Sequence, residues 1–269
     1  MEIRYLAIVA LVGTITIAGC SSDSGSNGST KYSGTISNIN PGQSLTLNTG
    51  KGALAFNTAG AQIVNDGENS LSNGKVVTIQ GTHDGSSGQA DTITYDSEIE
   101  GFVISNTIAA DDTGSMNVMG QTVVVDSTTV YGDDLTHASD IIVDTQNLPS
   151  VEVSGIFQSD GTILAKYMER KSDTNEIEIK GFATNVVISG DTATFNIAAC
   201  NIIVDANTKL DDMNSIADLT EGAKVEVEST RAKFVGSNDT CTVTAQKLEL
   251  EDENENEDDD GADDDNGNS

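Results

Sequence analysis

The chain has 269 residues, of which 36% are apolar and only 4% aromatic, and its formal net charge is −30. Its 13 lysines and arginines are too few to follow a phosphate backbone, so the composition predicts that nucleic acid is not a partner. The 26 glycines and only 2 prolines favour an all-β protein of short strands and turns over long helices.

Residues 1–30 are typical of a targeting segment rather than a domain. Arg4 precedes an apolar run over residues 5–18, an Ile-Ala-Gly-Cys sequence ends at Cys20, and a serine- and glycine-rich linker follows. The apolar run is short for a membrane-spanning helix and ends in small residues. The pattern resembles the lipobox of bacterial lipoproteins.

This resemblance implies that residues 1–19 form a signal helix that is removed and that Cys20 carries diacylglycerol. The new amino group would be acylated, for example with palmitate, and residues 20–30 would form a flexible linker in the periplasm. Ser21 rather than aspartate follows the cysteine, which by resemblance to the enterobacterial sorting pattern predicts the outer membrane. A plain signal peptide with an incidental cysteine and an uncleaved membrane anchor are the alternatives.

Three copies of one strand-and-turn pattern follow the linker. Residues 123–129 (VVVDSTT) match residues 202–208 (IIVDANT), and residues 77–81 (VTIQG) match residues 151–155 (VEVSG). A period of roughly 70 to 80 residues exceeds that of solenoid repeats, so each copy is expected to have its own core. The predicted domains are residues 31–96, 97–172 and 173–250, followed by a disordered acidic tail over residues 251–269.

In the third copy, alternating apolar and polar residues predict five strands. They cover residues 177–188, 192–198, 201–205, 223–228 and 241–250. An aspartate-capped short helix is expected over Asp211–Leu219, and residues 133–140 of the second copy have a similar pattern. Five strands with a short helix after the third outline a small OB-like barrel, so the sequence predicts three tandem barrels.

Several of these motifs occur together in a known family. A glycine-bearing first strand, a Val-Val-Val-Asp-x-x-Thr middle and a Val-x-Val-x-Gly strand precede an Asp-Gly-x-x-x-Ala motif at Asp160–Ala165. This order resembles the bacterial domain of unknown function 5666 over about residues 31–250, most loosely in the first copy, which has Phe56-Asn57-Thr58 instead. The resemblance implies tandem OB-like domains behind a lipoprotein signal, and it implies no activity.

Two further cysteines lie in the third copy. Cys200 ends one predicted strand and Cys241 begins another. Outside the inner membrane such a pair predicts a disulfide, which would close a loop of about 40 residues and stabilise the domain by roughly 3 to 4 kcal/mol. Two buried free thiols or a reactive thiol are the alternatives, whereas zinc is disfavoured because the chain has no CxxC spacing.

Few residues are candidates for catalysis. The two histidines, His83 and His137, lie in no metal-site or catalytic-triad spacing, and no nucleophile or phosphate-binding motif is present in the sequence. The sequence therefore predicts that the protein is not an enzyme.

Acidic pairs in turns are secondary candidates for calcium ligands, because carboxylates in loops are what calcium binds. They lack the Asp-x-Asp-x-Asp-Gly spacing, and helix capping and solubility explain them without a metal. Apart from this calcium candidate no cofactor is predicted. The acidic pairs are Asp111-Asp112, Asp133-Asp134 and Asp211-Asp212, of which the last two are the candidate ligands.

The sequence thus predicts a lipid-anchored, non-catalytic cell-envelope protein that acts as a binding or spacer module. Another envelope protein or a neutral saccharide is a candidate partner, besides the membrane that holds the lipid. The alternative functions are an accessory subunit of an envelope enzyme or transport system and a weak binder of divalent cations.

Overall fold

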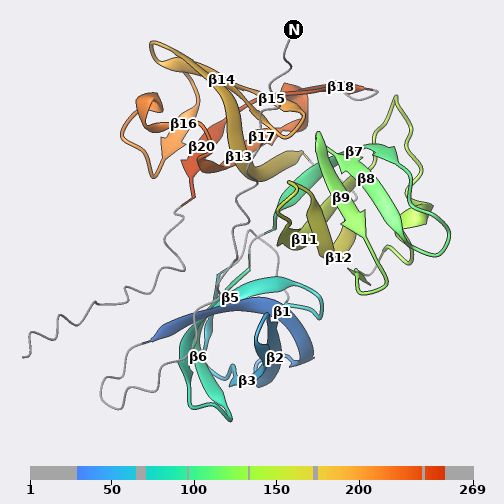
Figure 1. Cartoon of the computed structure of the whole chain (residues 1–269), viewed down its shortest axis with the longest axis vertical. Coiled ribbons are helices and arrows are strands. Elements are labelled where there is room, and N and C mark those ends of the chain that lie inside the picture. The colour runs from blue at the N-terminus through green and yellow to red at the C-terminus, as the bar shows by residue number, and fades with distance from the viewer. Residues whose placement is uncertain are drawn as a thin grey trace, which may run out of the picture.

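A computed structural model describes residues 29–64, 71–95, 97–132, 134–171, 175–237 and 240–251. This part of the chain is all-β, as Figure 1 shows. Its helix is limited to three 3₁₀ turns of three residues each. None of the helices in these ranges is long and apolar enough to cross a membrane. The expected signal helix, Cys20 and the acidic tail from residue 252 lie outside the described residues.

The first repeat forms a closed five-stranded barrel. β1, β2 and β3 pair in order, β5 pairs with both β1 and β6, and a parallel contact between β3 and β6 closes the ring. β4 pairs with residues 92–94 of β6, on the edge that β3 contacts at residues 88–89. The strands are β1 (Thr30–Asn40), β2 (Ser44–Thr49), β3 (Gly52–Asn57), β4 (Gln62–Val64), β5 (Val76–His83) and β6 (Gly88–Tyr95).

The second repeat closes in the same order. β7, β8 and β9 pair in sequence, β9 runs parallel to β12, and β11 joins β12 back to β7. β10 pairs with β12 where β4 pairs with β6 in the first repeat. The strands are β7 (Ile99–Asn106), β8 (Gly114–Val118), β9 (Gln121–Val125), β10 (Val130–Tyr131), β11 (Ser150–Phe157) and β12 (Ile163–Lys171).

In the third repeat the same pairing order is interrupted. Where one strand was expected over residues 241–250, the structure has two, β19 and β20, separated at Ala245 and Gln246. β19 runs parallel to β15, whereas β20 pairs with β17. The strands are β13 (Glu176–Ser189), β14 (Thr192–Ile197), β15 (Cys200–Val204), β16 (Lys209–Asp211), β17 (Lys224–Thr230), β18 (Phe234–Ser237), β19 (Thr240–Thr244) and β20 (Lys247–Leu250).

A serine lies where the third repeat is interrupted. In the first two repeats the fourth and fifth strands shift register at Gly81 and Gly155, and the ladder continues beyond each bulge. Ser229 occupies the corresponding place in the third repeat, and its hydroxyl donates a hydrogen bond to the Thr244 carbonyl at 2.6 Å. Continuous pairing therefore closes two five-stranded barrels, and the third ring is divided within its fifth strand.

Two short helices lie after the third strand of their repeats, as the sequence predicts. They are η1 (Ala138–Asp140) and η2 (Ile216–Asp218). The expected aspartate cap of η2 is wrong: Ser215 is the cap, accepting from the Ala217 N–H, while Asp218 accepts from the Ser215 N–H. A serine with an acidic residue three positions later forms a capping box, which satisfies two backbone donors at once.

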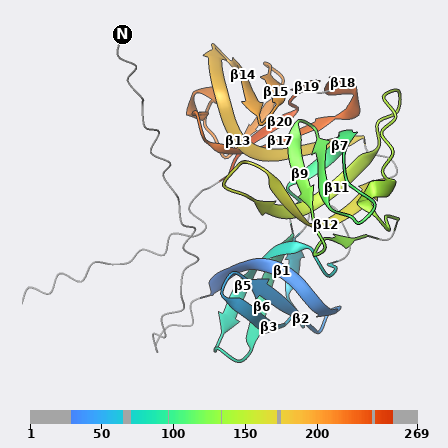
Figure 2. The same cartoon turned by 45° about the vertical axis from the view of Figure 1, so that its right-hand side comes forward.

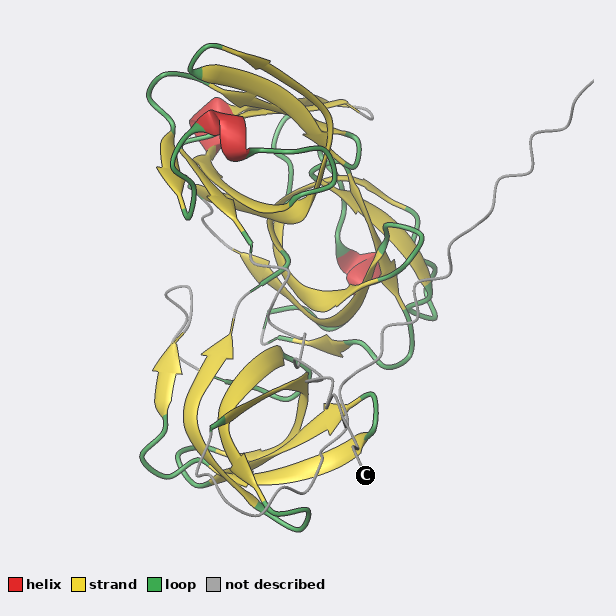
Figure 3. Cartoon of the chain, turned by 60° about the vertical axis from the view of Figure 1, so that its left-hand side comes forward, coloured by secondary structure: helices red, strands yellow, loops and turns green. Residues whose placement is uncertain are grey.

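The second and third repeats share a core, whereas the first has its own. β7 and β13 pair antiparallel, with Ile99 opposite Ile179, so the sheet continues from one repeat into the next. The Gln121 side chain also donates to the Lys180 carbonyl at 3.0 Å. Figures 2 and 3 show the second repeat between the first and the third.

Candidate functional site

The junction between the first and second repeats is built around a buried ion pair. Lys75 Nζ lies 3.9 Å from Glu152 Oε1, and both side chains are only 2% exposed. The same ammonium lies 4.0 Å from the Tyr95 ring centroid, and the Tyr95 hydroxyl donates to Glu152. The Val76 N–H donates to Ser154 Oγ at 2.9 Å. Charge, ring and backbone contacts thus join the two repeats.

Two tyrosines at this junction act as hydrogen-bond donors. Burial, followed by the charge of Glu152, raises the pKa of Tyr95 far above its ordinary value. Burial likewise raises the pKa of Tyr167, whose hydroxyl donates to Glu169 at 2.6 Å. Both phenols therefore keep their protons at any physiological pH and donate hydrogen bonds to the two glutamates.

A row of five glutamates crosses the seam between the second and third repeats. Each member is the direct cross-strand partner of the next, and such partners project from the same face of a sheet. The glutamate row runs over β12, β11, β7, β13 and β17 and consists of Glu169, Glu152, Glu100, Glu178 and Glu228.

Three lysines lie along this row and offset part of its charge. Lys171 Nζ lies 2.7 Å from Glu152, 3.4 Å from Glu100 and 3.6 Å from Glu169. Lys180, which is buried, lies 3.5 Å from Glu178. Lys247 closes the far end, 2.7 Å from Glu228. The first repeat has neutral residues at the corresponding positions, such as Ser33 and Thr78, whose hydroxyls are 2.8 Å apart.

Glu100 occupies the centre of the row. Burial raises the pKa of Glu100 from 4.5 to about 7, with Lys171 opposing the shift and Glu152 adding to it. The carboxyl therefore exchanges its proton near neutral pH. Within the described ranges no group of three or more acidic, histidine or cysteine side chains has a geometry that could hold a metal ion.

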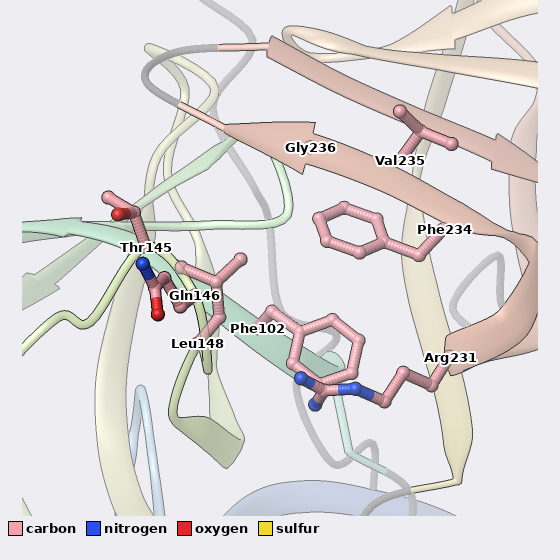
Figure 4. Close-up of a pocket in the computed structure, with 8 residues that line it drawn as sticks. All are labelled: Phe102, Thr145, Gln146, Leu148, Arg231, Phe234, Val235 and Gly236. Carbon is pink, nitrogen blue, oxygen red and sulfur yellow. The ribbon is translucent and has the colours of Figure 1, made fainter.

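A groove of about 310 Å³ opens where the second and third repeats meet. The Arg231 guanidinium stacks 4.5 Å from the Phe102 ring centroid, and the Phe102 and Phe234 rings are 5.1 Å apart. Arg231 Nη2 donates to Asn147 Oδ1 at 3.3 Å. We call this the junction groove, and Figure 4 shows its lining: Phe102, Thr145, Gln146, Leu148, Arg231, Phe234, Val235 and Gly236.

Both repeats contribute walls to the junction groove. Phe102 belongs to β7, and residues 145–148 belong to the loop before β11. The opposite wall is β18 with the short helix η3 (Arg231–Lys233) before it. In the described part of the chain neither Arg231 nor Lys233 forms an ion pair with a carboxylate. The groove is thus a partly apolar site with an available cation, and it contains groups for binding rather than for proton transfer.

The sequence-predicted residues have other roles. Cys200 and Cys241 form the predicted disulfide; they are cross-strand partners on β15 and β19, with Cα atoms 4.5 Å apart. Asp211 accepts from Lys209 Nζ at 2.7 Å, and this hydrogen bond holds the pKa of the carboxyl below its usual value. Asp212 adopts a positive φ of 51° in the following turn.

Asp134 is exposed in a turn, and its neighbour Asp133 and the lipidation candidate Cys20 lie outside the described residues. His137 Nδ1 contacts the Asp112 carboxylate, and this hydrogen bond raises the pKa of the histidine. His83 Nδ1 accepts from the Gly85 N–H at 3.0 Å within its hairpin turn.

Sequence reasoning missed Lys75, Glu152 and Arg231. A glutamate between two valines, Val151 and Val153, has the pattern of an exposed position on a half-buried strand, yet the first repeat covers it. No local signal in the sequence indicates that contact.

We correct the prediction that nucleic acid is excluded as a partner. The chain is similar to a multidomain protein with nucleic acid binding domains from Streptococcus pneumoniae, with 8% sequence identity, coverage of 80% of this chain and 72% of that chain, and a TM-score of 0.17. Net charge alone does not exclude that class, because OB-type domains bind through local surfaces. At this TM-score the likeness carries no argument about what this chain binds.

No curated protein matches the chain. A family model does match the second and third repeats, the two copies whose motifs agree most closely with that family. Residues 100–169 and 178–234 are each similar to the family described as "Domain of unknown function (DUF5666)".

Proposed function

We propose that this protein is a lipid-anchored, non-catalytic module of the cell envelope that holds a binding surface at a fixed distance from a membrane. In this proposal Cys20 carries the lipid, residues 1–19 are removed, and Ser21 directs the protein to the outer membrane. Acyl chains contribute about 0.8 kcal/mol per buried methylene, so two or more chains anchor a protein firmly.

The observation that carries the proposal is the pair of ordered junctions. Lys75 and Glu152 join the first repeat to the second, and the paired strands β7 and β13 join the second to the third. Flexible linkers between domains would allow the binding surface to take up many positions relative to the membrane, whereas ordered junctions favour a semi-rigid spacer.

We infer that the third repeat is a third OB-like barrel. Its strands β13, β14, β15, β19, β20 and β17 follow the pairing order of the other two repeats, and the break at Ala245 and Gln246 lies within one continuous segment. Three similar units in tandem support a spacer, because each added unit extends its reach.

Fractionation of cells that express the full chain tests the anchor. Cys20→Ser should move the protein from the membrane fraction to the soluble fraction and abolish its labelling by radioactive palmitate. The double variant Cys200→Ser/Cys241→Ser is the matched control and should stay with the membrane. Unchanged membrane retention of Cys20→Ser would refute the proposal.

A further inference from the structure

β18 is an open sheet edge. Its four residues pair with β19 on one side, and no other strand in the described ranges pairs with it. In an antiparallel ladder every second residue of an edge strand directs its N–H and C=O away from its partner. Soluble proteins usually cover or charge such an edge, since it can pair with another chain.

The same strand forms a wall of the junction groove. Phe234, Val235 and Gly236 all line the groove, and Figure 4 shows the Phe234 ring beside Phe102. Val235 is 73% exposed. An open edge beside a side-chain pocket is the arrangement that proteins use to bind extended peptides as an added strand.

Charge indicates which peptides fit. In a chain of net charge −30, Arg231 and Lys233 place two cations without carboxylate partners in the described structure directly before this edge. A guanidinium binds a carboxylate through two parallel hydrogen bonds. Arg231 is held in place by Phe102 and Asn147, so little freedom is lost when it binds.

We propose that β18 binds an extended, acidic peptide segment of a partner protein as an additional strand. One apolar side chain of that segment enters the junction groove, and a neighbouring carboxylate pairs with Arg231. Main-chain hydrogen bonds to β18 provide most of the affinity. This inference rests on the proposed function, because it names the class of partner protein that the anchored module binds.

The test uses the full mature chain with Cys20→Ser and a fluorescein-labelled peptide of alternating valine and glutamate. Fluorescence anisotropy should show saturable binding with a dissociation constant on the order of 10 to 100 μM. Arg231→Gln should weaken binding about tenfold, the effect of losing one charge-assisted pair. Lys51→Gln, an exposed lysine in the first repeat, should leave binding unchanged.

Two further measurements isolate the strand and the groove. Methylating alternate peptide nitrogens removes main-chain donors and should abolish binding to the unaltered chain. Gly236→Ala should also weaken binding, because the added Cβ would lie 2.2 Å from the Phe234 ring and displace it. No saturable binding below about 1 mM, equal binding of the methylated peptide, or displacement of the peptide by a single-stranded oligonucleotide would overturn the inference. Failure here leaves the membrane fractionation result unchanged, so the two proposals fail separately.

Discussion

Lys75 and Glu152 come from different repeats, yet their side chains meet at 3.9 Å with each only 2% exposed. A buried ion pair adds little net stability over apolar residues, but removing one partner leaves the other charge buried and unpaired. Tyr95 donates to the same Oε1 of Glu152 that faces Lys75, and Lys171 donates to Oε2. The pair therefore fixes which surfaces of the two repeats meet.

Replacing Lys75 by methionine should lower the free energy of unfolding by about 3 kcal/mol, because Glu152 would remain buried with fewer partners. Lys51→Met, at an exposed lysine, should change it by less than about 0.5 kcal/mol. The double variant Lys75→Met/Glu152→Gln should lose less than the sum of its single variants. Urea denaturation of the wild type, Lys75→Met, Glu152→Gln, the double variant and Lys51→Met measures these differences. Equal stabilities of Lys75→Met and Lys51→Met would contradict the role given to the pair.

Glu100 predicts a pH dependence. Burial raises the pKa of Glu100 to about 7 from an unfolded value of 4.5, so the folded chain binds more protons than the unfolded chain between these values. Stability should therefore fall as pH rises from 4.5 to 7 and then level off, as far as this group is concerned.

Thermal unfolding of the wild type and Glu100→Gln across this pH range gives the test. The glutamine variant should lose the part of the fall in stability with pH that is due to Glu100. Asp191→Asn, at an exposed turn, should keep that fall. Parallel pH profiles of the wild type and Glu100→Gln would show that Glu100 titrates normally.

Gly34 is the most constrained of the first-strand glycines. A Cβ at this position would lie 2.4 Å from the backbone oxygen of Asn48, whereas at Gly101 it would meet the flexible side chain of Met119. Gly34→Ala should therefore cost about 2 to 3 kcal/mol and Gly101→Ala distinctly less. Chemical denaturation of the two variants measures the difference, and the reverse order would be evidence against a close strand crossing at Gly34.

The disulfide should stabilise the third repeat. It closes a sequence separation of 41 residues. The Cys200→Ser/Cys241→Ser variant should lose about 3 to 4 kcal/mol of stability, as loop-closure entropy predicts. The wild type should lose the same stability when it unfolds in a reducing buffer, whereas the variant should lose no more in that buffer. A denaturation midpoint of the wild type that does not change on reduction would contradict this role of the disulfide.

The parts of the fold that depend on local pattern could be predicted from sequence. Alternation predicts strands such as residues 192–198. An even pair of cysteines in one domain, with a location outside the inner membrane as the expectation, predicts the disulfide between Cys200 and Cys241. The split after Thr244 could not be predicted, because it lies where the pairing partner changes: β19 pairs with β15, whereas β20 pairs with β17.

Most residues of the candidate sites could not be predicted from the sequence. Glu100 and Glu178 are 78 positions apart, and they face each other only because β7 pairs with β13. Arg231 and Phe102 likewise come from different repeats. A period-two pattern indicates which face a residue occupies, but it does not say which surface packs against that face.

The most direct test of a rigid, anchored spacer is the distance between its first and third repeats. Spin labels at the exposed positions Lys51→Cys and Asp191→Cys, in a chain with Cys20→Ser, can be measured by double electron–electron resonance. A single narrow distance distribution is expected, and Glu152→Lys, which places two like charges at the first junction, should broaden it. A broad distribution in the chain with an intact Lys75–Glu152 pair would contradict the proposal.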